Sequence, residues 1–206
     1  MLPAADYERI TQTIKTILDM KEASTAHACQ CFALAGAAIL ATHYWILARP
    51  VFGAAFVVLD DTSRDTLAYG MVHNNEASSD EDHYHAWIDT GDYVIDFMAP
   101  LYGQAMRTKG YAKDVPSWML QRQKSTISDN LINLRKQGDC YFSGNASLST
   151  RMVEYYLKEP EYRDLMKMAV AWFHKPPQPM LPLQTMEVDG KIHSVPLDKV
   201  YVTGYW

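Results

Sequence analysis

The sequence predicts an α+β domain in which a central helix packs on an antiparallel β-sheet, with a helical C-terminal extension. Three observations predict this fold class: helical periodicity up to Ala41, consecutive strand-like segments up to Met98, and helical patterns again after Pro100. Runs of helices and of strands are typical of α+β domains, whereas βαβ units alternate. The 206 residues fit one domain, with a core over about residues 1–100 and an extension with a closing hairpin over about residues 101–206.

The first helix is predicted from an apolar stripe. Ile10, Ile14, Ile17 and Leu18 recur at helical spacing. Asp6 precedes them and is a residue type that suits the N-cap position.

The second helix is predicted to begin after Ser24 and Thr25 and to end at Arg49 and Pro50. Most of its positions are apolar, so we expect it to be the buried central helix. One face carries, at helical spacing, Cys29, Ala33, Gly36, Ala37, Leu40 and Ala41.

The strands are expected between this helix and Pro100. The segments are rich in apolar residues, and polar or glycine-containing turns separate them. Thr90 and Gly91 join the last two strands and are a hairpin signal. The expected elements are the strands Val51–Leu59, Leu67–Val72, His83–Asp89 and Asp92–Met98, the turn Asp60–Asp65 and the acidic loop Asn74–Asp82.

Helical patterns return beyond Pro100. The candidate helices are Ser117–Arg135, Met152–Leu157 and Glu161–His174, with Pro160 separating the last two. The prolines of Pro176–Pro182 predict an extended linker. A closing hairpin is expected over Met186–Val195, around Asp189 and Gly190.

Composition and charge exclude several classes of protein. The formal net charge is −5 and the charges are mixed along the chain, so we expect no nucleic-acid partner. The longest apolar stretch, Cys31–Ala41, is too short to span a bilayer, so we expect no membrane partner. Charged residues within Met1–Ile10 argue against a secretory signal, and three cysteines cannot form a disulfide framework. We therefore expect a reduced, cytoplasmic protein; no feature of the sequence sets an oligomeric state.

The last two strands place a histidine beside a carboxylate. A two-residue loop at Thr90 and Gly91 pairs Asp89 with Asp92, and counting back from there pairs His85 with Asp96. Directly opposed residues share a face, with Cβ atoms roughly 4.5–5.5 Å apart, so the imidazole can donate to the carboxylate. Asp96 would then fix the orientation and tautomer of the ring, as the third member of a catalytic triad does.

Cys29 is the expected nucleophile. It lies near the start of the second helix, where free backbone N–H groups and the helix dipole favour a thiolate and could hold an oxyanion. Cys31 points about 200° around the helix from Cys29, so only one of them can face His85. The face shared with Ala33 and Ala37 selects Cys29. Cys29, His85 and Asp96 would form a thiol-nucleophile triad that needs no metal and no organic cofactor.

These residues resemble a known family. Cys29–Ala33 fits the C-x-x-[FY]-A segment of transglutaminase-like proteins, and His85–Trp87 and Val94–Asp96 are similar to their H-A-W motif and strand-borne Asp. The stretch from Ala48 to Gly53 is similar to the loop that leads from the catalytic helix into the sheet. The whole chain further resembles an uncharacterised bacterial family, a domain of unknown function placed in the papain-like cysteine proteinase superfold.

The likeness to known enzymes covers about Ala28 to Pro100. Arylamine N-acetyltransferases and peptide amidases of the superfold share the order Cys, His, Asp, but the Arg-Gly-Gly lead-in of the acetyltransferases is absent here. Ala23 stands where papain-like proteases keep an oxyanion-binding Gln. Any oxyanion hole must therefore come from backbone N–H groups or from an unidentified side chain.

Triad and resemblance together imply thiol-dependent hydrolysis or acyl transfer on an amide, peptide or acyl donor, through an acyl-thioester. The partner would be a small-molecule or peptide substrate. Two alternatives stay open. One is a catalytically inactive binding module of the same fold, because an isolated buried cysteine is usually an inert core residue. The other is a metal-binding protein that uses His83 and His85, with His27 or a cysteine completing the ligands.

Four further residues are candidates for the pocket or its rim: Trp87, His83, Glu81 and Asp82. Trp87 suits either the core or a pocket wall. Glu81 and Asp82 end the acidic loop just before His85, so they would disfavour anionic substrates if they shape specificity. The plainer interpretation is a solvated loop.

Overall fold

The computed structural model describes residues 1–21, 28–186 and 189–206. Helices and strands are mixed, and the sheet is mostly antiparallel, so the α+β class is confirmed. The described α-helices are α1 (Ala4–Met20), α2 (Cys29–Tyr44), α3 (Tyr102–Thr108), α4 (Ala146–Lys158) and α5 (Pro160–Trp172). The described strands are β1 (Arg49–Val58), β2 (Thr66–Tyr69), β3 (Met71–His73), β4 (Glu76–Ser78), β5 (His85–Asp89), β6 (Tyr93–Asp96), β7 (Trp118–Gln123), β8 (Cys140–Gly144), β9 (Leu183–Met186), β10 (Ile192–Val195) and β11 (Gly204–Tyr205).

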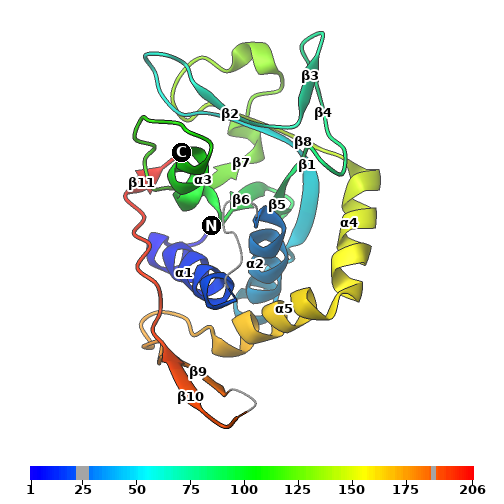
Figure 1. The fold of residues 1–206 in the computed structure, drawn as a ribbon. Helices are drawn as coiled ribbons and strands as arrows, with labels where there is room; N and C mark the ends of the chain where they lie inside the picture. Colours follow the sequence, from blue (N-terminus) through cyan, green and yellow to red (C-terminus); the bar gives the residue numbers. More distant parts are fainter. Residues whose placement is uncertain (22–27, 187–188) are drawn as a thin grey trace.

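One sheet dominates the part of the chain that the structure describes. It has seven strands in the order β11-β7-β6-β5-β1-β2, with β8 also paired to β1, and only β11 and β7 run parallel. The long strand β1 pairs with β5 through Arg49–Gly53, with β8 through Gly53–Val57 and with β2 through Ala55–Val58. The separate hairpins β3–β4 and β9–β10 project from the body of the molecule (Figure 1).

Helix α2 is the buried central helix that the sequence predicts. It packs on β5 and contacts α1 and α5 (Figure 1). Its residues Ile39 and Leu40 are fully buried, and so are Ile10 and Ile14 of α1. Gly36 allows α2 to approach the sheet closely, since a Cβ atom there would lie 2.5 Å from Phe97 and 2.9 Å from Ile88. None of the described helices combines the length and apolar character that crossing a bilayer requires.

The helix ends differ from the expected ones. Helix α1 begins at Ala4, so Asp6 lies in its first turn rather than at the N-cap, and its carboxylate accepts a hydrogen bond from Tyr44. The expected start of the second helix, at Ser24 and Thr25, lies outside the described residues. Helix α2 ends at Tyr44 and not at Arg49 and Pro50, because Trp45 adopts a left-handed conformation (φ 58°) and β1 already begins at Arg49.

The second predicted strand is interrupted. Strand β2 ends at Tyr69 because Gly70 has a φ of +123°, a conformation that favours glycine, and the chain then turns into the β3–β4 hairpin. This hairpin occupies part of the expected acidic loop. Asn74 and Asn75 form its two-residue turn with φ angles of 50° and 65°, which is the type I′ preference for Asn.

The predicted helix Ser117–Arg135 is wrong. Residues 118–123 form β7, which pairs with β6, and two short 3₁₀ turns follow at Lys124–Thr126 and Leu131–Asn133. Met119 and Leu120 are fully buried in the sheet, and so short an apolar run fits a strand as well as a helix. The chain beyond Pro100 is therefore not simply helical, since it also supplies β7, β8 and β11 to the sheet.

The two later helices are confirmed, with α4 longer than expected. It begins at Ala146, and the side chain of Asn145 caps it by accepting from the N–H of Leu148 at 3.0 Å. Pro160 separates the helices and occupies the first position of α5, where its missing N–H costs nothing.

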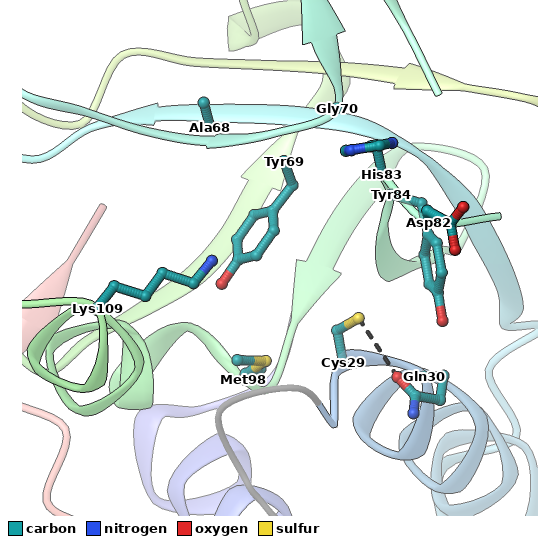
Figure 2. A pocket seen from close by; sticks show the side chains of 10 residues that line it. All are labelled: Cys29, Gln30, Ala68, Tyr69, Gly70, Asp82, His83, Tyr84, Met98 and Lys109. Carbon is teal, nitrogen blue, oxygen red and sulfur yellow. Dashed lines mark hydrogen bonds between the residues drawn. The ribbon is translucent and has the colours of Figure 1, made fainter. Parts of the chain in front are cut away.

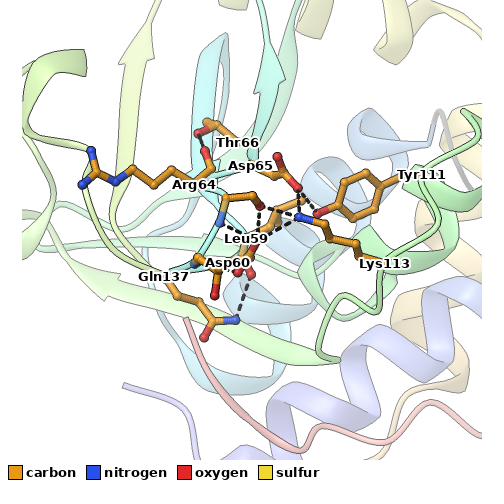
Figure 3. A network of polar contacts seen from close by, with 10 residues as sticks. Leu59, Asp60, Arg64, Asp65, Thr66, Tyr111, Lys113 and Gln137 are labelled. Atoms are coloured by element: carbon orange, nitrogen blue, oxygen red, sulfur yellow. Dashed lines mark hydrogen bonds and ion pairs between the residues drawn. The ribbon is translucent and has the colours of Figure 1, made fainter.

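A polar network ties the β1–β2 turn to the segment that follows α3 (Figure 3). The carboxylate of Asp60 accepts from the backbone N–H groups of Thr62 and Ser63 at 2.8 and 3.1 Å. Lys113 donates to Asp60 at 3.2 Å and to Asp65 at 2.7 Å. The loop after α3 is thereby held against the turn that precedes β2.

Candidate active site

A buried histidine and a buried aspartate form an ion pair between β5 and β6. Nε2 of His85 lies 2.6 Å from Oδ2 of Asp96, and the two side chains are 0% and 1% exposed. The expected register is wrong, because Asp89 pairs with Val94, and continuing this register sets Asp96 opposite Trp87. The error is a shift of two residues, which keeps His85 and Asp96 on one face of the sheet as diagonal neighbours. The contact is therefore made despite the different register.

Further hydrogen bonds fix Asp96. The Tyr102 hydroxyl donates to Oδ2, and the backbone N–H of Met98 donates to Oδ1 at 2.9 Å. Tyr7 of α1 donates to the backbone oxygen of Asp96 and accepts from the N–H of Leu120 at 3.2 Å. An ionised carboxylate with several donors is well placed to hold and orient an imidazolium.

The second nitrogen of the histidine is unpaired. Nδ1 of His85 is buried and has no hydrogen-bond partner among the described residues. The ring stacks on Tyr69, with centroids 4.5 Å apart and planes 17° apart. Burial lowers the pKa of His85, but the charge and hydrogen bond of Asp96 and the side chain of Cys29 outweigh it and raise this pKa to about 10. The imidazolium form is favoured at neutral pH.

Cys29 is the first residue of α2 and lines a cavity that His85 does not itself reach (Figure 2). Its thiol donates to Oε1 of Gln30 at 3.6 Å. The N–H groups of Cys31 and Phe32 bond to the oxygen of Ala28, so those of Cys29 and Gln30 precede the first intrahelical hydrogen bonds.

The other cysteines have a different environment. Burial, with a smaller contribution from Cys29, raises the pKa of Cys31 to about 12. Burial also raises the pKa of Cys140, to about 11. These raised pKa values keep both thiols neutral near pH 7, and neither residue lines the cavity at Cys29.

The cavity at Cys29 has a volume of about 360 Å³. Its walls come from the start of α2, the end of β2, the chain before β5 and the end of α3. It is lined by Cys29, Gln30, Ala68, Tyr69, Gly70, Asp82, His83, Tyr84, Met98 and Lys109 (Figure 2).

Two of the four expected rim residues line this cavity. Asp82 and His83 do, but Trp87 and Glu81 do not. Trp87 is core, since it is buried and its ring packs on Phe142 with centroids 5.0 Å apart. Glu81 pairs with Arg151 at 3.1 Å, because α4 brings that arginine to the acidic loop.

No motif or spacing in the sequence points to the site roles of Tyr69 and Lys109. Tyr69 was expected in a strand but not against the histidine. Lys109 follows α3, in a part of the chain without a recognisable motif. Their place in the cavity lining, the stacking of Tyr69 on His85 and the position of Lys109 over Tyr69 reveal that these residues belong to the site.

The metal pair of the alternative interpretation, His83 and His85, is not arranged as a ligand set. His83 lies before β5, largely exposed, with Nδ1 3.0 Å from Asp80, while the Nε2 atom of His85 is bonded to Asp96. In residues 1–21, 28–186 and 189–206, no three His, Cys, Asp or Glu side chains converge as metal ligands. His27 lies outside the described residues.

Comparison with known proteins gives a family but no activity. A solved protein described as "The crystal structure of genomics APC5867" is 29% identical, with a TM-score of 0.83, and the match covers 100% of this chain and 97% of that chain. No curated protein matches the chain. The family model "Protein of unknown function (DUF2026)" matches residues 3–206. The chain therefore belongs to the DUF2026 family of proteins of unknown function.

Proposed function

We propose that this protein is a thiol-dependent hydrolase or acyltransferase that acts on an amide, peptide or acyl donor. Cys29 is the nucleophile, His85 the base and Asp96 the residue that orients it. The observation that carries the proposal is the unpaired Nδ1 atom of His85, buried beside Cys29 while Asp96 holds Nε2. An unsatisfied buried polar atom costs about 1–3 kcal/mol, and a catalytic role accounts for its retention.

The arrangement also supports a place in the papain-like or transglutaminase-like superfold. A cysteine at the start of a buried helix faces a histidine and an aspartate on adjacent strands, in the chain order Cys, His, Asp. This arrangement follows the triad logic of activated thiols, in which a base removes the proton and a third group orients the base.

The chemistry follows from the atoms present. Rotation about the Cα–Cβ bond of Cys29 would turn the thiol from Gln30 toward Nδ1 of His85. The neutral ring takes the thiol proton there, which gives a thiolate–imidazolium pair, the form that the raised pKa of His85 favours. The sulfur attacks the carbonyl carbon, and the N–H groups of Cys29 and Gln30 would stabilise the oxyanion. His85 returns the proton to the leaving group, which leaves an acyl-thioester. Water or an amine then attacks the thioester, the C–S bond breaks and the thiol is regenerated.

Alkylation tests the nucleophile. With iodoacetamide near neutral pH, we expect Cys29 to react at least roughly tenfold faster than Cys31 and Cys140, since their raised pKa values keep them neutral. Peptide mass mapping over time measures the three rates. A Cys29→Ser variant is the control and should lose the fast phase.

An activated ester tests the acyl chemistry. p-Nitrophenyl acetate should transfer its acetyl group to the sulfur of Cys29 with release of p-nitrophenolate, and hydroxylamine should remove the adduct. An adduct on the intact protein that is absent from Cys29→Ser supports the proposal. If Cys29 reacts no faster than Cys140 and takes up no acetyl group, the protein is an inactive binding module of this fold.

A further inference from the structure

The cavity at Cys29 carries a lysine without a carboxylate partner. Lys109 follows the last residue of α3 and lines the cavity (Figure 2). Among the described residues, the ion pairs of lysine side chains involve other lysines and not Lys109. Its Nζ atom instead lies 5.6 Å from the centroid of the Tyr69 ring. Such an ammonium group creates a positive potential at one end of the cavity.

Tyr69 adds a second donor at the same place. Figure 2 shows its hydroxyl group and the ammonium group of Lys109 side by side, both within the cavity. Burial, and the charges of Cys29 and Asp96, raise the pKa of Tyr69, so its hydroxyl stays protonated and can donate. The same ring stacks on His85, which places this donor pair next to the catalytic imidazole.

The acidic loop does not cancel this charge. Glu81 is paired with Arg151, and Asp82 lies on the other side of Cys29 from Lys109 (Figure 2). From the sequence, Glu81 and Asp82 would disfavour anionic substrates if they shape specificity, and no motif places Lys109 at the rim. The structure reverses this expectation for the end of the cavity that holds Lys109.

We propose that Lys109 and the Tyr69 hydroxyl form a subsite for a carboxylate group of the acyl donor, so that the protein acts on small, negatively charged donors. The inference rests on the proposed function, since it assigns the substrate class of that site. An ammonium and a hydroxyl group supply two donors to the two carboxylate oxygens, and a charged donor strengthens such bonds. A volume of about 360 Å³ suits a small molecule.

Two alkylating agents of nearly equal size test the subsite, because iodoacetate carries a carboxylate and iodoacetamide does not. The measured quantity is the ratio of their rate constants at Cys29. We expect Lys109→Met to lower the ratio of iodoacetate to iodoacetamide roughly fivefold, as a single charge at close range predicts. Lys109→Arg should retain most of the ratio. Tyr69→Phe should lower it in the same direction, because it removes the hydroxyl and keeps the ring.

Lys167→Met is the matched control. It removes the same charge from an exposed position on α5, where the nearest acidic atom, of Asp164, is 3.9 Å away, and it should keep the wild-type ratio. A ratio that Lys109→Met leaves unchanged, or that Lys167→Met lowers equally, overturns the subsite while Cys29 remains the fast-reacting thiol. If Cys29 reacts no faster than Cys140 with either reagent, the proposed function fails and the subsite fails with it.

Discussion

His85 and Asp96 are joined across a diagonal of the β5–β6 hairpin, with Nε2 of the histidine 2.6 Å from Oδ2 of the aspartate. This bond leaves Nδ1 as the buried ring nitrogen without a hydrogen-bond partner among the described residues, and the proposed mechanism assigns this atom to Cys29. Asp96 therefore decides which nitrogen of the ring carries the exchangeable proton. The effect of Asp96 on Cys29 can be measured without a known substrate.

Replacing Asp96 by Asn should slow the alkylation of Cys29 near neutral pH by roughly ten- to a hundredfold. The amide group can donate to Nε2, which moves the ring proton to Nδ1, and a protonated neutral ring cannot accept the thiol proton there. Loss of the carboxylate also removes the main cause that raises the pKa of His85. The rate of iodoacetamide labelling at Cys29, measured from pH 5 to pH 10, checks this prediction.

Asp89→Asn is the matched control for this experiment. Asp89 lies in the same hairpin and pairs with Arg49 at 3.1 Å and Lys124 at 2.8 Å, at the far end of β5 from the cavity. The control should keep the wild-type rate. Equal slowing in both variants would assign the effect to the hairpin rather than to the histidine.

The ion pair should also make stability depend on pH. The folded-state pKa of His85, about 10, exceeds its ordinary value of 6.5, so the folded protein binds this proton more tightly than the unfolded chain. The stabilisation is complete below about pH 6.5 and is lost as the pH rises through 10, with a slope of up to about 1.4 kcal/mol per pH unit. Urea unfolding at pH 6, 8 and 10 measures the free energy of unfolding of the wild type and of Asp96→Asn. The difference between the two should become smaller as the pH rises. A constant difference would exclude this linkage.

Tyr102→Phe should destabilise the fold by about 1–3 kcal/mol, the range for a buried hydrogen bond to a charged group. The hydroxyl of the fully buried Tyr102 donates to Asp96, and the phenylalanine ring fills the same space without a donor. Tyr111→Phe removes a similar bond, 2.8 Å long, to Asp65 in the network of Figure 3. Because solvent can replace that bond, the loss should be smaller. Equal urea midpoints for the two variants would show that the hydrogen bond from Tyr102 to Asp96 adds no more stability than the more exposed bond from Tyr111 to Asp65.

The contact between His85 and Asp96 could be predicted from the sequence, because it depends on the alternation of side chains between the two faces of a strand. Moving a turn of unchanged length by one position along the chain shifts the pairing of a hairpin by two residues, so His85 and Asp96 stay on one face in both the expected and the observed register. The position of Cys29 at the start of α2 likewise followed from helical phase and a short motif.

Lys109, Arg151 and β7 could not be predicted in the same way. Each comes from the chain beyond Pro100, and tertiary packing alone brings Lys109 to the cavity, Arg151 to the acidic loop and β7 to the sheet. Trp87 shows the limit of a local motif. Its position two residues after His85 does not predict whether its side chain lines the cavity or packs in a hydrophobic cluster.

Gly36→Ala should destabilise the protein by about 1–3 kcal/mol, although alanine is the better helix former. The added methyl group would lie 2.5 Å from Phe97 and 2.9 Å from Ile88, so α2 would have to move away from β5. Ala41→Gly, at an exposed position of the same helix, measures the effect of helix propensity alone. It should lower the free energy of unfolding by no more than about 1 kcal/mol. Because Cys29 begins α2 and His85 begins β5, the shift should also slow the alkylation of Cys29. A Gly36→Ala variant with wild-type stability and labelling would show that the helix can yield here without disturbing the site.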